Sequence, residues 1–232
     1  MLSFKGFQKT TLIDFPGKVA CTFFLANCNF RCPFCYNASL VFDKGTGFEM
    51  DETRALEFLA ERKGFLDGVC ITGGEPLLHR LEEFLKKVKA LGLLVKLDTN
   101  GSRPEALKSL LAAGLLDYVA MDIKASKKGY EKAAGTKVDL EKIGQSISLI
   151  RNSGVDYEFR CTVVPSLHNE KGLLEIGEWL KGSKRLFLQQ FNSSVPLLDV
   201  SLQGTSPFSA EEMRHFAGSL KPFFGEVGLR GI

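Results

Sequence analysis

The sequence predicts an α/β fold in which parallel strands alternate with helices. Six short runs of apolar and β-branched residues recur along the chain, and a segment with helical periodicity follows each of them. The apolar runs are nearly continuous, which is typical of parallel strands covered by helices. Six such units are fewer than the eight that close a full barrel. The pattern therefore fits either a doubly wound sheet or an open, partial barrel.

The predicted elements follow one another in regular order. The strands are expected at residues 19–26, 69–72, 94–99, 118–124, 157–164 and 185–191. The helices are expected at 51–62, 81–91, 104–113, 140–150, 169–179 and 209–220, with Asp51 and Asn169 as N-caps and Pro104 in a first turn. We expect a single domain, 1–232, with a lead-in at 1–18, a core of six βα units at 19–191, and a C-terminal helix and tail at 192–232.

The composition narrows the class of protein. A net charge of +3 is too small to indicate a nucleic-acid partner. The chain has no apolar run long enough for a membrane span, and its first residues lack the layout of a signal peptide. We therefore expect a cytoplasmic protein without a membrane partner. In that compartment thiols stay reduced, and clustered cysteines bind metal or take part in catalysis more often than they form disulfides.

Three cysteines stand close together directly after the first predicted strand. Cys28, Cys32 and Cys35 are spaced C-x3-C-x2-C, so that three thiolates can face one point. Closed structural zinc sites normally have four protein ligands, whereas three ligands leave one metal position open for a small molecule. The alternatives are a zinc site with a distant fourth ligand, or unrelated buried thiols. The other cysteines lie inside predicted strands, where we expect them to be core residues: Cys21, Cys70 and Cys161.

Polar residues gather where the predicted strands end. In parallel α/β folds, ligands bind at the carboxyl ends of the strands. The residues at these ends are Gly73, Gly74, Glu75, Pro76, Asp98, Thr99, Asn100, Asp122, Lys124, Gln189, Gln190 and, directly after them, Phe191, with Arg160 inside the fifth strand. Their structural alternatives are a tight turn for the glycines, helix caps for the aspartates and solvated charges for the two cations. Because several separate segments converge on one rim, an active site is the favoured interpretation.

These motifs resemble a known family. The C-x3-C-x2-C triplet with Phe34 before its last cysteine, followed by Gly73-Gly74-Glu75-Pro76 and six βα units, is similar to the radical S-adenosylmethionine (SAM) enzymes. The segments 14–17, 98–101 and 122–124 resemble the activating enzymes of glycyl radical enzymes. The similarity is greatest to the short form that serves anaerobic ribonucleoside-triphosphate reductase. The resemblance implies a partial (β/α)6 TIM-like barrel, the radical SAM core.

The resemblance also implies roles for individual residues. The three cysteines would hold one [4Fe-4S] cluster whose open iron chelates SAM. Phe34 would flank the adenine, and the Gly73–Pro76 turn would bind the methionine end. Asp122 and Lys124 match a motif that contacts ribose and carboxylate. The remaining implied contacts are Asp98 with Asp122 for a monovalent cation, Thr99, Asn100 and Arg160 for the cofactor, Gln190 or Phe191 for the adenine, and Asp14 for the substrate.

The implied activity is that of an oxidoreductase. Flavodoxin or ferredoxin would reduce the cluster, SAM would be cleaved to a 5′-deoxyadenosyl radical, and that radical would take hydrogen from a glycine of a glycyl radical enzyme. No acid–base pair is needed, because the cofactor carries the chemistry. One alternative is a radical SAM enzyme that acts on a small molecule or a nucleic acid. A second is an electron-transfer protein, which would not need the polar rim.

Overall fold

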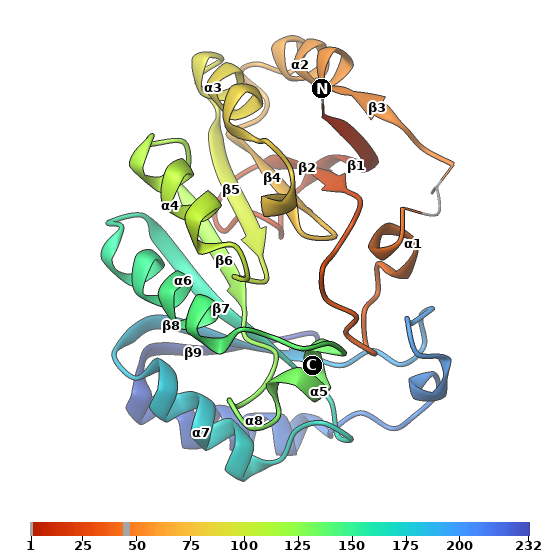
Figure 1. Cartoon of the computed structure of the whole chain (residues 1–232), viewed down its shortest axis with the longest axis vertical. Helices are drawn as coiled ribbons and strands as arrows, with labels where there is room; N and C mark the ends of the chain where they lie inside the picture. Colours follow the sequence, from red (N-terminus) through yellow and green to blue (C-terminus); the bar gives the residue numbers. More distant parts are fainter. Residues whose placement is uncertain (1, 44–46) are drawn as a thin grey trace.

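The structure is a computed structural model that describes residues 2–43 and 47–232, and its strands form one curved sheet with the longer helices along its convex side (Figure 1). The strands are β1 (Ser3–Thr11), β2 (Ala20–Leu25), β3 (Met50–Asp51), β4 (Gly68–Gly73), β5 (Leu94–Thr99), β6 (Tyr118–Asp122), β7 (Asp156–Val163), β8 (Ser183–Gln190) and β9 (Phe224–Arg230). The α-helices are α1 (Ala38–Val41), α2 (Glu52–Glu61), α3 (Glu82–Ala90), α4 (Pro104–Ala112), α5 (Tyr130–Ala134), α6 (Leu140–Asn152), α7 (Glu170–Leu180) and α8 (Ala210–Leu220). Short 3₁₀ turns are η1 (Pro76–Leu78), η2 (Val200–Leu202) and η3 (Lys221–Phe223).

The order of the strands decides between the two predicted architectures. The sheet runs β3-β1-β2-β4-β5-β6-β7-β8-β9, and all neighbours from β2 to β9 are parallel. Each new parallel strand is added on the same side, as in a barrel, whereas a doubly wound sheet reverses its order at a switch point. The end strands β3 and β9 do not pair with each other, so the barrel is partial and open. The predicted α/β fold with six βα units is confirmed.

The predicted helix starts are also confirmed. The Asp51 side chain accepts a hydrogen bond from the main-chain nitrogen of Arg54 at 2.8 Å, which caps α2. Asn169 caps α7 in the same way through the nitrogen of Gly172 at 2.8 Å. Pro104 is the first residue of α4, where its missing N–H has no cost.

Two strands lie where the sequence predicted only a lead-in and a tail. β1 pairs antiparallel with β2, and β9 pairs parallel with β8 at the far end of the sheet. Most residues of both strands are partly exposed, so neither shows the continuous apolar run of a covered strand. Their strand character depends on a neighbouring strand rather than on their own sequence pattern.

Side-chain alternation along the strands separates the core from the inner side of the sheet. On β7, Phe159 and Cys161 pack in the hydrophobic core, while Arg160 and Thr162 face the opposite way and line a cavity. The predicted core positions of Cys21 and Cys161 are confirmed. Cys70 is buried too, but its thiol lies beside charged groups of the inner side rather than in that core. Among the described residues, no helix combines the length and apolarity that a membrane span requires.

Candidate active site

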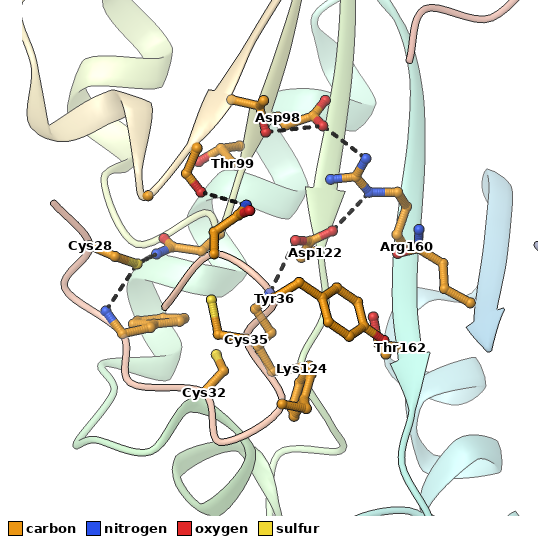
Figure 2. A pocket seen from close by; sticks show the side chains of 18 of the residues that line it. Cys28, Cys32, Cys35, Tyr36, Asp98, Thr99, Asp122, Lys124, Arg160 and Thr162 are labelled. Carbon is orange, nitrogen blue, oxygen red and sulfur yellow. Dashed lines mark hydrogen bonds and ion pairs between the residues drawn. The ribbon is translucent and has the colours of Figure 1, made fainter. Parts of the chain in front are cut away.

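A cavity of about 340 Å³ lies at the carboxyl ends of the parallel strands, within the size range of small-ligand sites. It brings together most of the residues that the sequence predicted for the site. Those that line it are Cys28, Cys32, Phe34, Cys35, Gly73, Gly74, Asp98, Thr99, Asn100, Asp122, Lys124, Arg160 and Gln190. Figure 2 shows the three cysteines facing the space below Asp98 and Asp122.

The cysteine loop between β2 and α1 is fixed by contacts from distant segments. The nitrogen of Arg31 donates to the carbonyl oxygen of Ala134 in α5 at 2.8 Å. Residues after β8 donate to the loop as well, since the nitrogen of Asp199 reaches the carbonyl of Pro33 at 2.9 Å. The position of the thiols is therefore set by α5 and by the segment after β8, not by the loop alone.

The three cysteines are free, with Cys32 buried and Cys28 and Cys35 partly buried. Burial raises the pKa of Cys28 to about 11, and it raises the pKa of Cys32 and Cys35 in the same direction, although the nearby Lys124 opposes the rise. Each thiol must lose its proton before it binds iron, so loading of the site releases protons.

The sequence allowed two kinds of metal site, and the arrangement of the thiols fits only one of them. In residues 2–43 and 47–232, no three His, Cys, Asp or Glu side chains converge on the position of one metal ion, as a mononuclear zinc site would require. In an iron–sulfur cluster each thiolate binds its own iron, so the thiols need only surround a common space. Three free thiols around one cavity fit such a cluster and leave one of its irons without a protein ligand.

The Gly73–Pro76 turn joins the cysteine loop to the sheet. The nitrogens of Gly74 and Glu75 donate to the carbonyl oxygens of Leu25 and Asn27, both at 2.7 Å. A Cβ atom on Gly74 would lie 2.0 Å from the carbonyl oxygen of Asn27, so only glycine permits this approach. Glycine was expected here to leave room for a ligand. In the structure, the lack of a side chain at Gly73 and Gly74 makes room for the backbone of Leu25 and Asn27.

The structure does not support the predicted contact of Glu75 with the amine of SAM. The side chain is fully buried and does not line the cavity. One carboxylate oxygen accepts from the Thr99 hydroxyl at 2.8 Å and the nitrogen of Leu77 at 3.0 Å, and the other accepts from the nitrogen of Asn100 at 2.7 Å. Burial raises the pKa of Glu75 to about 7, against the effect of these hydrogen bonds. Glu75 therefore holds the ends of β4 and β5 together.

Three further predicted residues lie outside the cavity lining. Pro76 begins the 3₁₀ turn η1 and is buried. Phe191 packs in the hydrophobic core, because the strand alternation after Gln190 turns it away from the inner side. Asp14 precedes β2, at the opposite end from the cysteines, and accepts a hydrogen bond from the Thr22 hydroxyl at 2.6 Å. The expected contacts of Phe191 with adenine and of Asp14 with substrate are not supported by these positions.

A chain of alternating charges lines one wall of the cavity (Figure 2). Arg160 donates to Asp98 at 3.0 Å and to Asp122 at 2.8 Å, Lys124 pairs with Asp122 at 3.0 Å, and Lys96 pairs with Asp98. Burial alone would raise the pKa of both carboxyls, but the neighbouring cations outweigh it and hold the pKa of Asp98 and Asp122 below the usual range. Three cations thus face two anions, which leaves one net positive charge suited to a carboxylate ligand.

The same ion pairs bear on the predicted cation site. The Arg160 guanidinium lies between Asp98 and Asp122, so a protein cation takes the position expected for a monovalent metal ion. Each carboxylate has a second partner of positive charge, Lys96 or Lys124. The two aspartates are therefore already neutralised without a bound ion.

Sequence reasoning missed several residues of the cavity wall. Tyr36 follows the last cysteine, and its hydroxyl accepts from the nitrogen of Asn192 at 2.8 Å. Thr162 lies at the end of β7, where alternation along a strand could have indicated it, whereas Gln189 lies where the sequence predicted it, at the end of β8. Arg230 and Gly231 come from β9 and its end, and without that strand in the prediction no signal placed them here.

These features define a class of protein, and comparison with known families agrees with it. The model of the radical SAM superfamily matches residues 23–180, so the chain belongs to the radical SAM superfamily. Enzymes of this superfamily use a [4Fe-4S] cluster and SAM. The chain is therefore an iron–sulfur enzyme that depends on SAM, and Cys28, Cys32 and Cys35 are its candidate cluster ligands.

Individual proteins resemble the chain to different extents. It is 30% identical, over 98% of its length and 95% of the relative's, to a Methanocaldococcus jannaschii protein described as a "putative glycyl-radical enzyme activating enzyme". It is 45% identical to 7-carboxy-7-deazaguanine synthase of Hyperthermus butylicus, over 34% of each chain. Among solved structures, SuiB of Streptococcus suis bound to SAM shares the fold, with a TM-score of 0.70 and 12% identity over 89% of this chain and 49% of SuiB.

Proposed function

We propose that this protein activates a glycyl radical enzyme by taking a hydrogen atom from the Cα of a glycine in that partner. The observation that carries the proposal is the similarity to the Methanocaldococcus jannaschii protein, which extends over nearly the whole of both chains. An anaerobic ribonucleoside-triphosphate reductase is the partner that we propose first, with flavodoxin or ferredoxin as the electron donor and the cytoplasm as the location.

The open barrel supports a macromolecular substrate. Within the described residues the sheet ends at β3 and β9, which do not pair, so no strand closes the barrel between them. When bound, the reduced cluster and SAM supply the 5′-deoxyadenosyl radical that abstracts hydrogen. The chain's own residues bind and orient: the three cysteines hold the cluster, and Lys124, Asp122 and Arg160 form the charged wall next to it.

The proposed roles of the remaining residues follow from their positions. Phe34 and Gln190 line the cavity and are proposed to contact the adenine. Asn100 donates to Asn29 at 3.0 Å and lies beside Cys28, so we assign it to the orientation of the cysteine loop and its ligand. Thr99 lines the cavity while its hydroxyl holds Glu75.

A radical SAM enzyme that acts on a small molecule is the second candidate. It is favoured by the higher identity to 7-carboxy-7-deazaguanine synthase, although that similarity covers only a third of the chain. The two candidates differ in the source of the hydrogen atom that ends up in 5′-deoxyadenosine.

The test is an anaerobic reaction of the iron-loaded protein with dithionite, SAM and a glycyl radical enzyme whose glycines carry deuterium. We expect deuterium in the released 5′-deoxyadenosine and a glycyl radical signal in the electron paramagnetic resonance spectrum of the partner. Cleavage of SAM without deuterium transfer from any tested glycyl radical enzyme to 5′-deoxyadenosine would reject the activase and favour the small-molecule candidate.

A further inference from the structure

The last strand carries an arginine, Arg230, into the wall of the cavity. β9 pairs parallel with β8, and its register places Arg230 beside Gln189. Both side chains line the cavity that contains the cysteines, together with Thr162 of β7. This wall consists of one guanidinium, one amide and one hydroxyl, and none of the roles assigned above to the cofactor uses Arg230.

Arg230 is held rigidly from two directions. Its two terminal nitrogens donate to the two carboxylate oxygens of Glu158 at 2.7 and 2.8 Å, a bidentate pair. Its guanidinium also stacks over the ring of Phe187, 3.9 Å from the ring centre. Gly228 makes this arrangement possible, because a Cβ atom there would lie 2.4 Å from the Phe187 ring.

Despite these contacts, the Arg230 side chain remains accessible to solvent, whereas that of its partner Glu158 does not. Its side chain is 32% exposed, whereas that of Glu158 is 1% exposed. A guanidinium has five N–H donors, and the pair with Glu158 uses two of them. Three donors therefore remain on a guanidinium that lines the cavity and is held in place by Glu158 and Phe187.

The charge balance of this pair indicates what Arg230 binds. Because Glu158 already neutralises it, an additional anion would face a neutral pair and would gain little Coulomb energy for its desolvation. A neutral acceptor such as an amide carbonyl can use the free donors without disturbing the pair. The amide of Gln189 and the hydroxyl of Thr162 beside it are neutral groups that complement a peptide backbone as well.

We propose that Arg230 is a substrate-binding residue that donates to main-chain carbonyl groups of an extended, glycine-containing segment of the partner protein. This inference rests on the proposed function and names the contact that positions the glycine. β9 is the last strand of the sheet, and within the described part of the chain it pairs only with β8. An extended segment that enters along this open edge meets Arg230 at the point where the strand reaches the cavity.

The test uses the intact, iron-loaded protein and a pool of short capped peptides with a central dideuterated glycine and randomised flanks. Two quantities are measured: the peptide and SAM retained by the protein on ultrafiltration, and the deuterium transferred to 5′-deoxyadenosine. Arg230→Lys keeps the charge opposite Glu158 but loses the planar fork. We expect it to weaken retention of the peptides about tenfold and to change retention of SAM less than about twofold.

A second variant and a control distinguish a specific loss of peptide binding from a loss of folding. Arg230→Gln combined with Glu158→Gln removes both charges together and should weaken peptide retention as Arg230→Lys does. Arg185→Lys is the control, because Arg185 lies on the neighbouring strand β8 and one of its terminal nitrogens donates to both carboxylate oxygens of Asp156, but it does not line the cavity. We expect the control to bind peptide and SAM as the wild type does.

The outcomes separate the two proposals. Equal peptide retention by the wild type and both Arg230 variants would overturn the role of Arg230 and leave the activase intact if deuterium is still transferred. An equal loss of SAM and peptide would place Arg230 in the SAM site and also overturn it. SAM cleavage by the wild type without peptide retention or deuterium transfer would reject both proposals.

Discussion

The carboxylate of Glu75 accepts a hydrogen bond from the main-chain nitrogen of Asn100 at 2.7 Å, and this contact ties the turn after β4 to the end of β5. Both residues had been expected to face the cofactor. Instead, the Glu75 side chain is fully buried, and the main-chain nitrogen of Glu75 donates to Asn27 in the cysteine loop. Glu75 thus stabilises the rim from inside the protein, and its neighbours Gly74, Thr99 and Asn100 line the cavity.

The first prediction concerns the pH dependence of stability. Burial raises the pKa of Glu75 from 4.5 to about 7, so between these values the folded protein keeps a proton that the unfolded chain has released. The free energy of unfolding should therefore fall as the pH rises through this window. Glu75→Gln does not titrate, so its unfolding free energy should not show this fall. Between pH 4.5 and about 7, the unfolding free energy of the wild type should therefore fall by about 2–4 kcal/mol relative to that of the variant. Urea denaturation of the metal-free protein measures this, and parallel pH profiles would contradict it.

The second prediction concerns the close approach of Gly74 to the cysteine loop. Gly74→Ala places a methyl group 2.0 Å from the carbonyl oxygen of Asn27, so the turn must move. We expect a loss of about 3 kcal/mol or more in unfolding free energy, together with a lower iron content after loading. Gly144→Ala in α6 is the control, because no atom lies within 4 Å of its added Cβ, and it should stabilise the protein by about 0.5–1 kcal/mol. Equal stability of both variants would disprove the close-approach argument.

The third prediction concerns the cluster ligands. Cys32→Ala removes one of the three cavity thiols, and we expect the loaded protein to lose its cluster absorbance and to release no 5′-deoxyadenosine from SAM. Cys21→Ala changes a fully buried thiol that lies in the hydrophobic core and should keep both signals. Iron and sulfide analysis after anaerobic loading provides the measurement. A full cluster in Cys32→Ala, or its loss in Cys21→Ala, would show that the ligands are assigned wrongly.

The fourth prediction concerns the bridge between the two aspartates. Arg160→Lys cannot donate to Asp98 and Asp122 in the same planar geometry, so the variant should be destabilised by about 1–3 kcal/mol. The KM for SAM should rise about tenfold, since the positively charged wall of the cavity is displaced. Arg151→Lys on the exposed side of α6 is the control and should leave both quantities unchanged. An unaltered KM for SAM in Arg160→Lys would separate this charge chain from cofactor binding.

The sequence by itself determined the parallel βα order, the helix caps and the cysteine triplet. These features depend on local periodicity and spacing, and a buried strand such as β6 or a cap such as Asp51 carries its signal in a few neighbouring residues. Most of the rim was predicted for a related reason, because the end of a parallel strand is a definite place in the sequence.

Only the tertiary structure decided which of those rim residues face the ligand. Glu75 turns into the protein because η1 and the end of β5 supply three donors to it, and Arg160 bridges two strands that are separated along the chain. β1 and β9 became strands through pairing with their neighbours, and only the pairing of β9 brought Arg230 to the cavity. Such positions depend on contacts between residues far apart in the sequence, and these contacts exist only after the sheet has curved into a partial barrel.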